Sequence, residues 1–219
     1  MRKLSDKEIR ANILEVSNLM YQKGMVNAFE GNVSYNNEGR IYITPSQVCK
    51  GYLESEMIVV TDMSGNILEA KDGYVPSSEL KMHLECYRIR DEIKAVIHSH
   101  SPYATAYAIA NKPITSKAYP EMIVVFREIP LVKYGRPSSE EIYAGFEKVI
   151  KDGFEVFLIA NHGIISVGDD VFDAYFKNEA VENTARVLTI TELIGGEKAL
   201  PEKERKALHL MHEKHFKKY

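Results

Sequence analysis

The chain has few cysteines and no long apolar segment, and each absence excludes a class of protein. Only Cys49 and Cys86 occur in 219 residues, which is too few for a disulfide framework, and they do not form a Cys-x-x-Cys pair. A metal site would therefore need histidine and carboxylate ligands. No segment reads as a signal peptide or a transmembrane helix, so we expect a cytoplasmic protein that makes no membrane contact.

Charge of one sign is also lacking. The sequence has 28 lysine and arginine residues against 31 aspartate and glutamate residues, a net charge of −3, with no basic stripe, and this argues against nucleic acid as a partner. The one locally basic segment is "ALHLMHEKHFKKY" at 207–219. Its histidines, His209, His212 and His215, are spaced three apart. We expect them on the polar side of a last helix rather than in a metal site.

Hydrophobic periodicity predicts alternating helices and strands. An amphipathic helix follows a Ser5/Glu8 capping box and ends near Gly24. Other helices are expected at 76–90, at 101–110, at 137–153 after a Ser138/Glu141 capping box, at 171–194 and from 202. Strands are expected at 32–36, 40–44, 57–62, 67–70, 94–98, 122–126 and 154–160. This order predicts a mixed sheet with helices on both faces, and no linker or repeat divides the single domain expected over 1–219.

The stretch "AVIHSHSP" at 95–102 places two imidazoles where an apolar run meets a turn. Residues i and i+2 of a strand share a face, so His98 and His100 would converge beyond the strand's end. A third histidine, His162 in "NHG", follows the buried run at 154–160. Three imidazoles from two adjacent strand ends can form a zinc site with an open position. Taken singly, each histidine is equally compatible with a hydrogen-bonded turn residue.

A carboxylate and two serines begin the helix at 76–90, in "PSSE". Glu79 could simply cap this helix. Alternatively, Ser77, Ser78 and free N–H groups bind a phosphate or carboxylate while Glu79 faces the metal as a base. His83 lies one turn further on the same face; it is either a fourth ligand or, as we favour, a packed, hydrogen-bonded histidine.

Five segments, "EGNVSYN", "ITPS", "PSSE", "VIHSHSPYATAYA" and "ANHG", occur in this order, and together they resemble the class II aldolase/adducin family. The resemblance implies an α/β fold, with three α/β/α layers around a mixed, largely antiparallel sheet. It implies a zinc-dependent aldolase that cleaves a ketose 1-phosphate of the L-fuculose 1-phosphate type to dihydroxyacetone phosphate and an aldehyde, through a metal-stabilised enediolate. It also implies a homotetramer with active sites between subunits.

The resemblance assigns roles residue by residue. One Zn²⁺ per subunit would be held by His98, His100 and His162, with Glu79 both at the metal and as the catalytic acid/base. The substrate phosphate would be bound by Asn32, Ser46, Gln47, Ser77 and Ser78. Tyr219, or less surely Tyr119, would be the phenolic acid supplied by a neighbouring subunit. At Gln47 the family usually has glycine, which leaves the shape of the phosphate pocket open.

Four other functions are compatible with parts of this sequence. A Schiff-base aldolase would need a lysine, but Lys94 precedes His98 by four residues, roughly 13 Å along a strand. A ribulose-phosphate 4-epimerase would resemble Ser-Ser-Asp where this chain has Ser-Ser-Glu at 77–79. A methylthioribulose-phosphate dehydratase uses similar metal chemistry. A non-catalytic adducin-like interaction module has no need of three convergent histidines.

Overall fold

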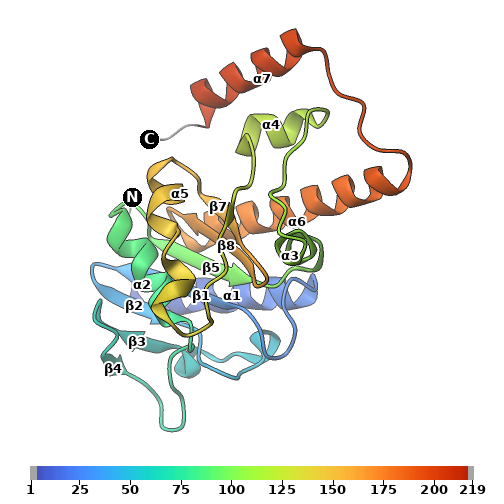
Figure 1. The fold of residues 1–219 in the computed structure, drawn as a ribbon. Coiled ribbons are helices and arrows are strands. Elements are labelled where there is room, and N and C mark those ends of the chain that lie inside the picture. The colour runs from blue at the N-terminus through green and yellow to red at the C-terminus, as the bar shows by residue number, and fades with distance from the viewer. Residues whose placement is uncertain (1–3, 217–219) are drawn as a thin grey trace.

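The computed structural model describes residues 4–216 as helices packed on an eight-stranded sheet (Figure 1). The strand order is β4-β3-β2-β1-β5-β8-β7-β6, and every neighbouring pair is antiparallel except β6 and β7. The strands are β1 Asn32–Asn37, β2 Arg40–Ile43, β3 Val59–Thr61, β4 Ile67–Glu69, β5 Ala95–Ser99, β6 Leu131–Val132, β7 Val156–Ile159 and β8 Gly163–Gly168. The helices are α1 Asp6–Gln22, α2 Leu80–Ile89, α3 Pro102–Ile109, α4 Pro120–Phe126, α5 Phe146–Lys151, α6 Val171–Leu193 and α7 Glu202–His215.

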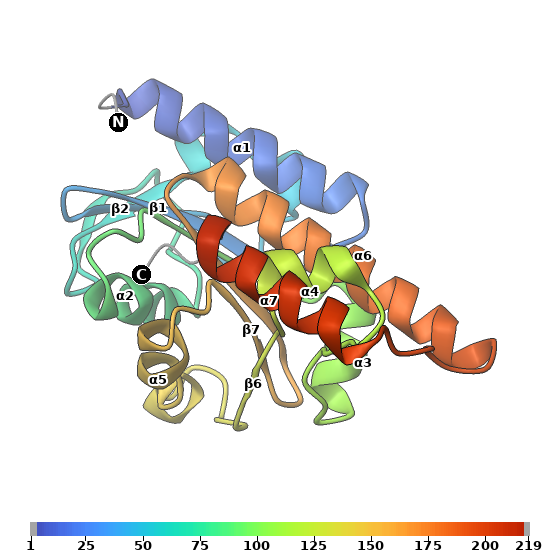
Figure 2. The same ribbon diagram turned by 90° about the horizontal axis from the view of Figure 1, so that it is seen from above.

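Helices cover both faces of the sheet, which makes three layers (Figure 2). Along β5, Ala95 and Ile97 join the apolar cluster beneath α1 and α6, whereas Val96 joins the cluster beneath α2 and α5. His98 has the parity of Val96, so it faces the α2 layer. The predicted α/β/α fold with a mixed, largely antiparallel sheet is confirmed.

The first helix is formed as its sequence predicts. The Ser5 side chain accepts a hydrogen bond from the Glu8 N–H, and the Glu8 carboxylate accepts one from the Ser5 N–H, which completes the capping box. Ile9, Ile13 and the other apolar residues of its inner face are fully buried against the sheet.

Two predicted elements are wrong. Residues 122–126, expected as a strand, form most of α4: Pro120 occupies its first turn, and its apolar side chains pack into a cluster with α3 and α6. The single helix expected at 137–153 is a 3-10 turn, Glu140–Tyr143, followed by the short α5. Ser138 has a φ of 63°, and Ser139, the N-terminal cap, makes no side-chain hydrogen bond to the turn that follows it, so the predicted capping box does not form.

Two strands were not expected, the two-residue edge strand β6 and the longer β8. β8 lies in the middle of the sheet, between β5 and β7, and all of its residues are buried. β8 therefore separates β5 from β7, which corresponds to the predicted strand at 154–160. The expectation that these two strands are adjacent is wrong. Within residues 4–216, no helix is both long enough and apolar enough to span a membrane.

Candidate active site

Sheet register gathers the candidate residues at one edge. β5 is antiparallel to both of its neighbours, so its carboxyl end lies beside the amino ends of β1 and β8. Asn32, the first residue of β1, is opposite His98, and Ile164 at the start of β8 is opposite Ser99. His162 stands in the turn just before β8. His162 thus lies near His98 and His100 because β8 pairs with β5, and not because it ends the strand next to β5.

The three histidines converge through their Nε2 atoms. His98 Nε2 lies 2.8 Å from His100 Nε2 and 3.1 Å from His162 Nε2. Within residues 4–216 they are the one group of three or more histidine, cysteine, aspartate or glutamate residues with ligand atoms close enough to hold a metal ion. Gly163 is required for this approach, because a Cβ there would lie 2.5 Å from the Ser99 carbonyl oxygen and 2.9 Å from the His100 ring.

His98 and His100 each have a partner at the Nδ1 atom, on the ring edge away from the cluster. His98 Nδ1 donates a hydrogen bond to the Ile164 carbonyl at 2.9 Å, which leaves the Nε2 lone pair directed at the other rings. His100 Nδ1 lies 3.5 Å from Glu30 Oε1, a partner that the sequence reasoning missed although Glu30 begins the "EGNVSYN" segment. Burial lowers the pKa of both His98 and His100 to about 4, so both rings are neutral near pH 7, as metal ligands must be.

The Glu79 carboxylate sits against this cluster. Glu79 Oε1 lies 2.9 Å from His162 Nε2, and Oε2 lies 3.5 Å from His98 Nε2 and accepts a 2.8 Å hydrogen bond from Asn32 Nδ2. Its side chain makes no capping bond to α2. Burial acts to raise the pKa of Glu79, but the His98 ring and the bonds from His162 and Asn32 outweigh it and hold this pKa below its usual range. Glu79 is therefore an anion beside the histidines.

His83 supports Glu79 indirectly, through Asn32. It is fully buried, its Nε2 donates to Asn32 Oδ1, and its Nδ1 accepts from Ser34 Oγ at 2.6 Å. Tyr87 OH lies 2.6 Å from the same Ser34 oxygen. The chain of bonds from Tyr87 through His83 and Asn32 fixes the amide that binds Glu79. The prediction of a packed, hydrogen-bonded His83 is confirmed.

A cleft of about 240 Å³ opens beside Glu79 and His100. Two loops form its wall: Ser46 N–H bonds to the Val75 carbonyl, and Ser77 N–H bonds to the Thr44 carbonyl. The cleft is lined by Phe29, Glu30, Gly31, Asn32, Pro45, Ser46, Gln47, Lys50, Ser77, Ser78, Glu79 and His100. All five residues expected at a phosphate are among them, together with Lys50, for which the sequence carried no periodic or spacing signal.

Polar groups of this wall lack partners within the described chain. The backbone N–H groups of Gln47 and Ser78 and the hydroxyls of Ser46 and Ser78 make no hydrogen bond there. Gln47 has a φ of 58°, which lies in the left-handed region that favours glycine, the residue expected here from the resemblance to the family. Free N–H and O–H donors around a cleft are suited to an anion.

Other candidates lie elsewhere. Tyr119 packs against the apolar cluster of α3 and α4 and does not line the cleft of its own chain, and Tyr219 lies outside the described residues. Lys94 Nζ donates to the Asp91 carbonyl at the opposite end of β5 from His98. It is therefore not placed to act beside the histidines.

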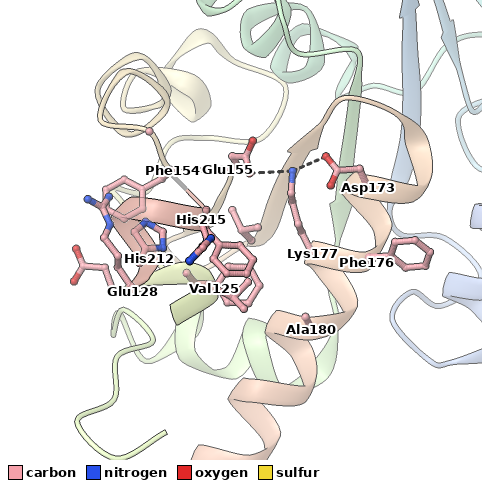
Figure 3. A pocket seen from close by; sticks show the side chains of 15 residues that line it. Val125, Glu128, Phe154, Glu155, Asp173, Phe176, Lys177, Ala180, His212 and His215 are labelled. Carbon is pink, nitrogen blue, oxygen red and sulfur yellow. Dashed lines mark hydrogen bonds and ion pairs between the residues drawn. The ribbon is translucent and has the colours of Figure 1, made fainter. Parts of the chain in front are cut away.

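A separate cavity of about 500 Å³ lies between α4, α6 and α7 (Figure 3). His212 and His215 line it. The expectation that His212 belongs to a polar helix face is wrong, because this side chain is buried against α4 and its Nδ1 donates to the Val124 carbonyl at 2.9 Å.

Comparison with known proteins gives a consistent result. The family described as "Class II Aldolase and Adducin N-terminal domain" matches residues 11–189. An L-fuculose phosphate aldolase of Methanococcus maripaludis is 35% identical over 185 residues, which is 84% of this chain and 98% of that protein. A 3-oxo-tetronate 4-phosphate decarboxylase of Haemophilus influenzae is 31% identical over 192 residues, 85% of this chain and 88% of that protein.

A solved structure titled "L-fuculose 1-phosphate aldolase" superimposes with a TM-score of 0.85 at 27% identity and covers 98% of this chain and 99% of its own. The family match spans most of the sequence and includes the histidines, Glu79 and the cleft loops. The chain therefore belongs to the class II aldolase and adducin family, as one of its enzymes, a class II aldolase.

Proposed function

We propose that this enzyme is a zinc-dependent aldolase that cleaves a ketose 1-phosphate, of the L-fuculose 1-phosphate type, to dihydroxyacetone phosphate and an aldehyde. The observation that carries the proposal is the arrangement of three imidazoles and one carboxylate at the inner end of a cleft lined by free N–H and O–H donors. The relatives named as fuculose phosphate aldolases support this choice of substrate.

The histidines fit a divalent ion. Two ring nitrogens 2.8 Å apart can share at most one proton, and facing lone pairs repel, so a cation between them satisfies the geometry. Nitrogen ligands of a tetrahedral zinc ion are about 3.4 Å apart, close to the separations found here. We infer that His98, His100 and His162 hold the metal. Bound there, zinc would supply Lewis-acid stabilisation of the negative charge that develops on the substrate oxygens during cleavage.

The chain's own residues have separate tasks. Ser46, Ser77, Ser78 and the N–H of Gln47 hold the phosphate at the non-reacting end, which orients the sugar toward the histidines. Glu79 is anionic and adjacent to the metal ligands, so it is placed to take and return the proton of the phosphate-bearing half. Asn32, fixed by His83, keeps this carboxylate oriented.

The aldehyde half needs a proton from another group. The described residues that line the cleft include no tyrosine. We assign this role to Tyr219, or else Tyr119, of a neighbouring subunit in a homotetramer with active sites between subunits. Phe29 supports a contact at this place, because it lines the cleft and is 80% exposed in the single chain. We place the enzyme in the cytoplasm, in carbohydrate metabolism.

The test is a metal-defined assay. Purified protein is analysed for bound metal, stripped with a chelator, reloaded with zinc, and assayed for release of dihydroxyacetone phosphate from a panel of ketose 1-phosphates and 5-phosphates. Activity on a 1-phosphate that disappears on stripping and returns with zinc is expected, with circular dichroism unchanged. Full activity in metal-free protein would refute the zinc mechanism. Epimerised sugar, loss of water or release of carbon dioxide would refute the aldol reaction in favour of a family alternative.

A further inference from the structure

Lys50 is a buried cation in the wall of the cleft. It begins the 3-10 turn Lys50–Tyr52, lines the cleft and is 3% exposed. Its Nζ donates one hydrogen bond, to the Val48 carbonyl at 2.7 Å, and forms no ion pair with a described residue. An ammonium has three N–H donors, so two remain for another partner.

The turn that carries Lys50 is held firmly. A Cβ on Gly51 would lie 2.3 Å from the Tyr21 ring of α1, so the backbone here rests directly on that ring. The Tyr52 ring packs beside it, with centroids 6.1 Å apart. The position of Lys50 is therefore set by the packing of α1 against the turn.

Burying this lysine costs stability. Lysine is almost never fully buried unless paired, because taking an ammonium out of water is unfavourable. Burial accordingly lowers the pKa of Lys50, although the nearby Cys49 and Glu79 act in the opposite direction. An apolar side chain would fill the same space at less cost. A gain outside folding, such as ligand binding, would account for the ammonium.

The charge of the cleft indicates the ligand. Its described lining contains two carboxylates, Glu30 and Glu79, and Lys50 is the one lysine or arginine among those residues. A phosphate dianion held near these carboxylates would be repelled unless a cation compensated it. Free N–H groups and hydroxyls supply hydrogen bonds but no net charge.

We propose that Lys50 binds the phosphate of the substrate and makes the enzyme select phosphorylated over unphosphorylated ketoses. The proposal rests on the proposed function, in which this cleft takes the phosphate end of the sugar. Lys50 acts as a point charge beside Ser46 and Gln47, with its two remaining N–H groups directed to phosphate oxygens. It takes no part in bond cleavage.

The experiment compares Lys50→Met, Lys50→Gln and Lys50→Arg with Lys81→Met, which removes the same charge from the exposed side of α2. Binding of inorganic phosphate to the zinc-loaded proteins is measured by calorimetry, and kcat and KM are measured with a ketose 1-phosphate and with its unphosphorylated parent. For Lys50→Met and Lys50→Gln we expect about 10- to 100-fold weaker binding of phosphate and a similar rise in the KM for the ketose 1-phosphate. The kcat for this substrate and the kinetic constants for the unphosphorylated parent should change little. Arginine should retain part of the affinity, and Lys81→Met all of it.

The outcomes separate this proposal from the proposed function. Phosphate binding that is unchanged in Lys50→Met and Lys50→Gln would overturn the role of Lys50. Equal loss of activity on phosphorylated and unphosphorylated sugar would also overturn it, because that indicates a structural role. If wild-type protein cleaves no ketose phosphate yet binds phosphate in a Lys50-dependent way, the proposed function fails and Lys50 remains an anion ligand.

Discussion

Replacing Gln47 with glycine should make the protein more stable and bind phosphate more tightly. Gln47 has a φ of 58°, and a residue with a Cβ pays about 1 to 2 kcal/mol in this region. Glycine avoids that cost but loses about 0.5 to 1 kcal/mol more conformational entropy on folding. The Gln47 side chain is exposed and makes no hydrogen bond within the described chain, so little else is lost.

The net expectation is a gain of about 0.5 to 1 kcal/mol in the free energy of unfolding, or a Tm higher by about 1 to 4 °C. Urea unfolding at one protein concentration measures it, since association would otherwise shift the midpoint. Without a side chain at 47, the backbone N–H is also more open to an anion, so the KM for a phosphorylated substrate should fall a few-fold.

Two variants serve as controls. Gln47→Ala removes the side chain but keeps the left-handed strain, so it should gain access to phosphate without gaining stability. Ser138→Gly relieves a φ of 63° in an exposed loop outside the cleft, so it should gain stability without changing KM. The reasoning is refuted if Gln47→Gly is less stable than wild type, or if Gln47→Ala matches it in stability.

Three further predictions concern the buried polar groups. Glu79→Gln should lower kcat by about 10²- to 10⁴-fold while metal analysis finds the ion still bound, and turnover within a few-fold of wild type would remove Glu79 from the chemistry. Burial lowers the pKa of His83 to about 4 from its ordinary 6.5, so between those pH values only the unfolded chain takes up this proton. The free energy of unfolding of the metal-free protein should therefore fall by roughly 3 kcal/mol per such histidine as the pH drops through that window. In urea unfolding at a series of pH values, His83→Gln should reduce the dependence of stability on pH, and an unchanged dependence would contradict the assignment. Asn178 bridges the buried Ser99 and Ser166 hydroxyls, so Asn178→Ala should cost about 2 to 4 kcal/mol in urea unfolding, and a change below about 0.5 kcal/mol would show that water replaces the amide.

Features that depend on near neighbours in sequence could be predicted without the structure. The Ser5/Glu8 capping box and the buried face of α1 follow from three- and four-residue spacing, and both are found. The convergence of His98 and His100 follows from the two-residue period of a strand. The five motifs in their order were enough to predict the family, because each contains residue types that metal-dependent aldol chemistry requires.

Tertiary packing determines whether a short apolar segment forms a helix or a strand, and where it lies in the sheet. The run at 122–126 is compatible with a strand or a helix by length and composition, and its contacts with α3 and α6 select the helix. β8, rich in small and β-branched residues, gave too weak a pattern on its own, yet its position between β5 and β7 sets which strand ends are neighbours.

The candidate site was chosen residue by residue from sequence, but its assembly belongs to the tertiary structure. Residue type marked Glu79 and His162 as candidates, whereas the 2.9 Å between them depends on the register of β1, β5 and β8 and on where α2 begins. No sequence pattern indicated Lys50 or the hydrogen bond between His83 and Asn32, because the sequence does not distinguish a buried lysine or histidine from an exposed one. Burial and the partners across the sheet give these groups their charge state and direction, and both are properties of the folded chain alone.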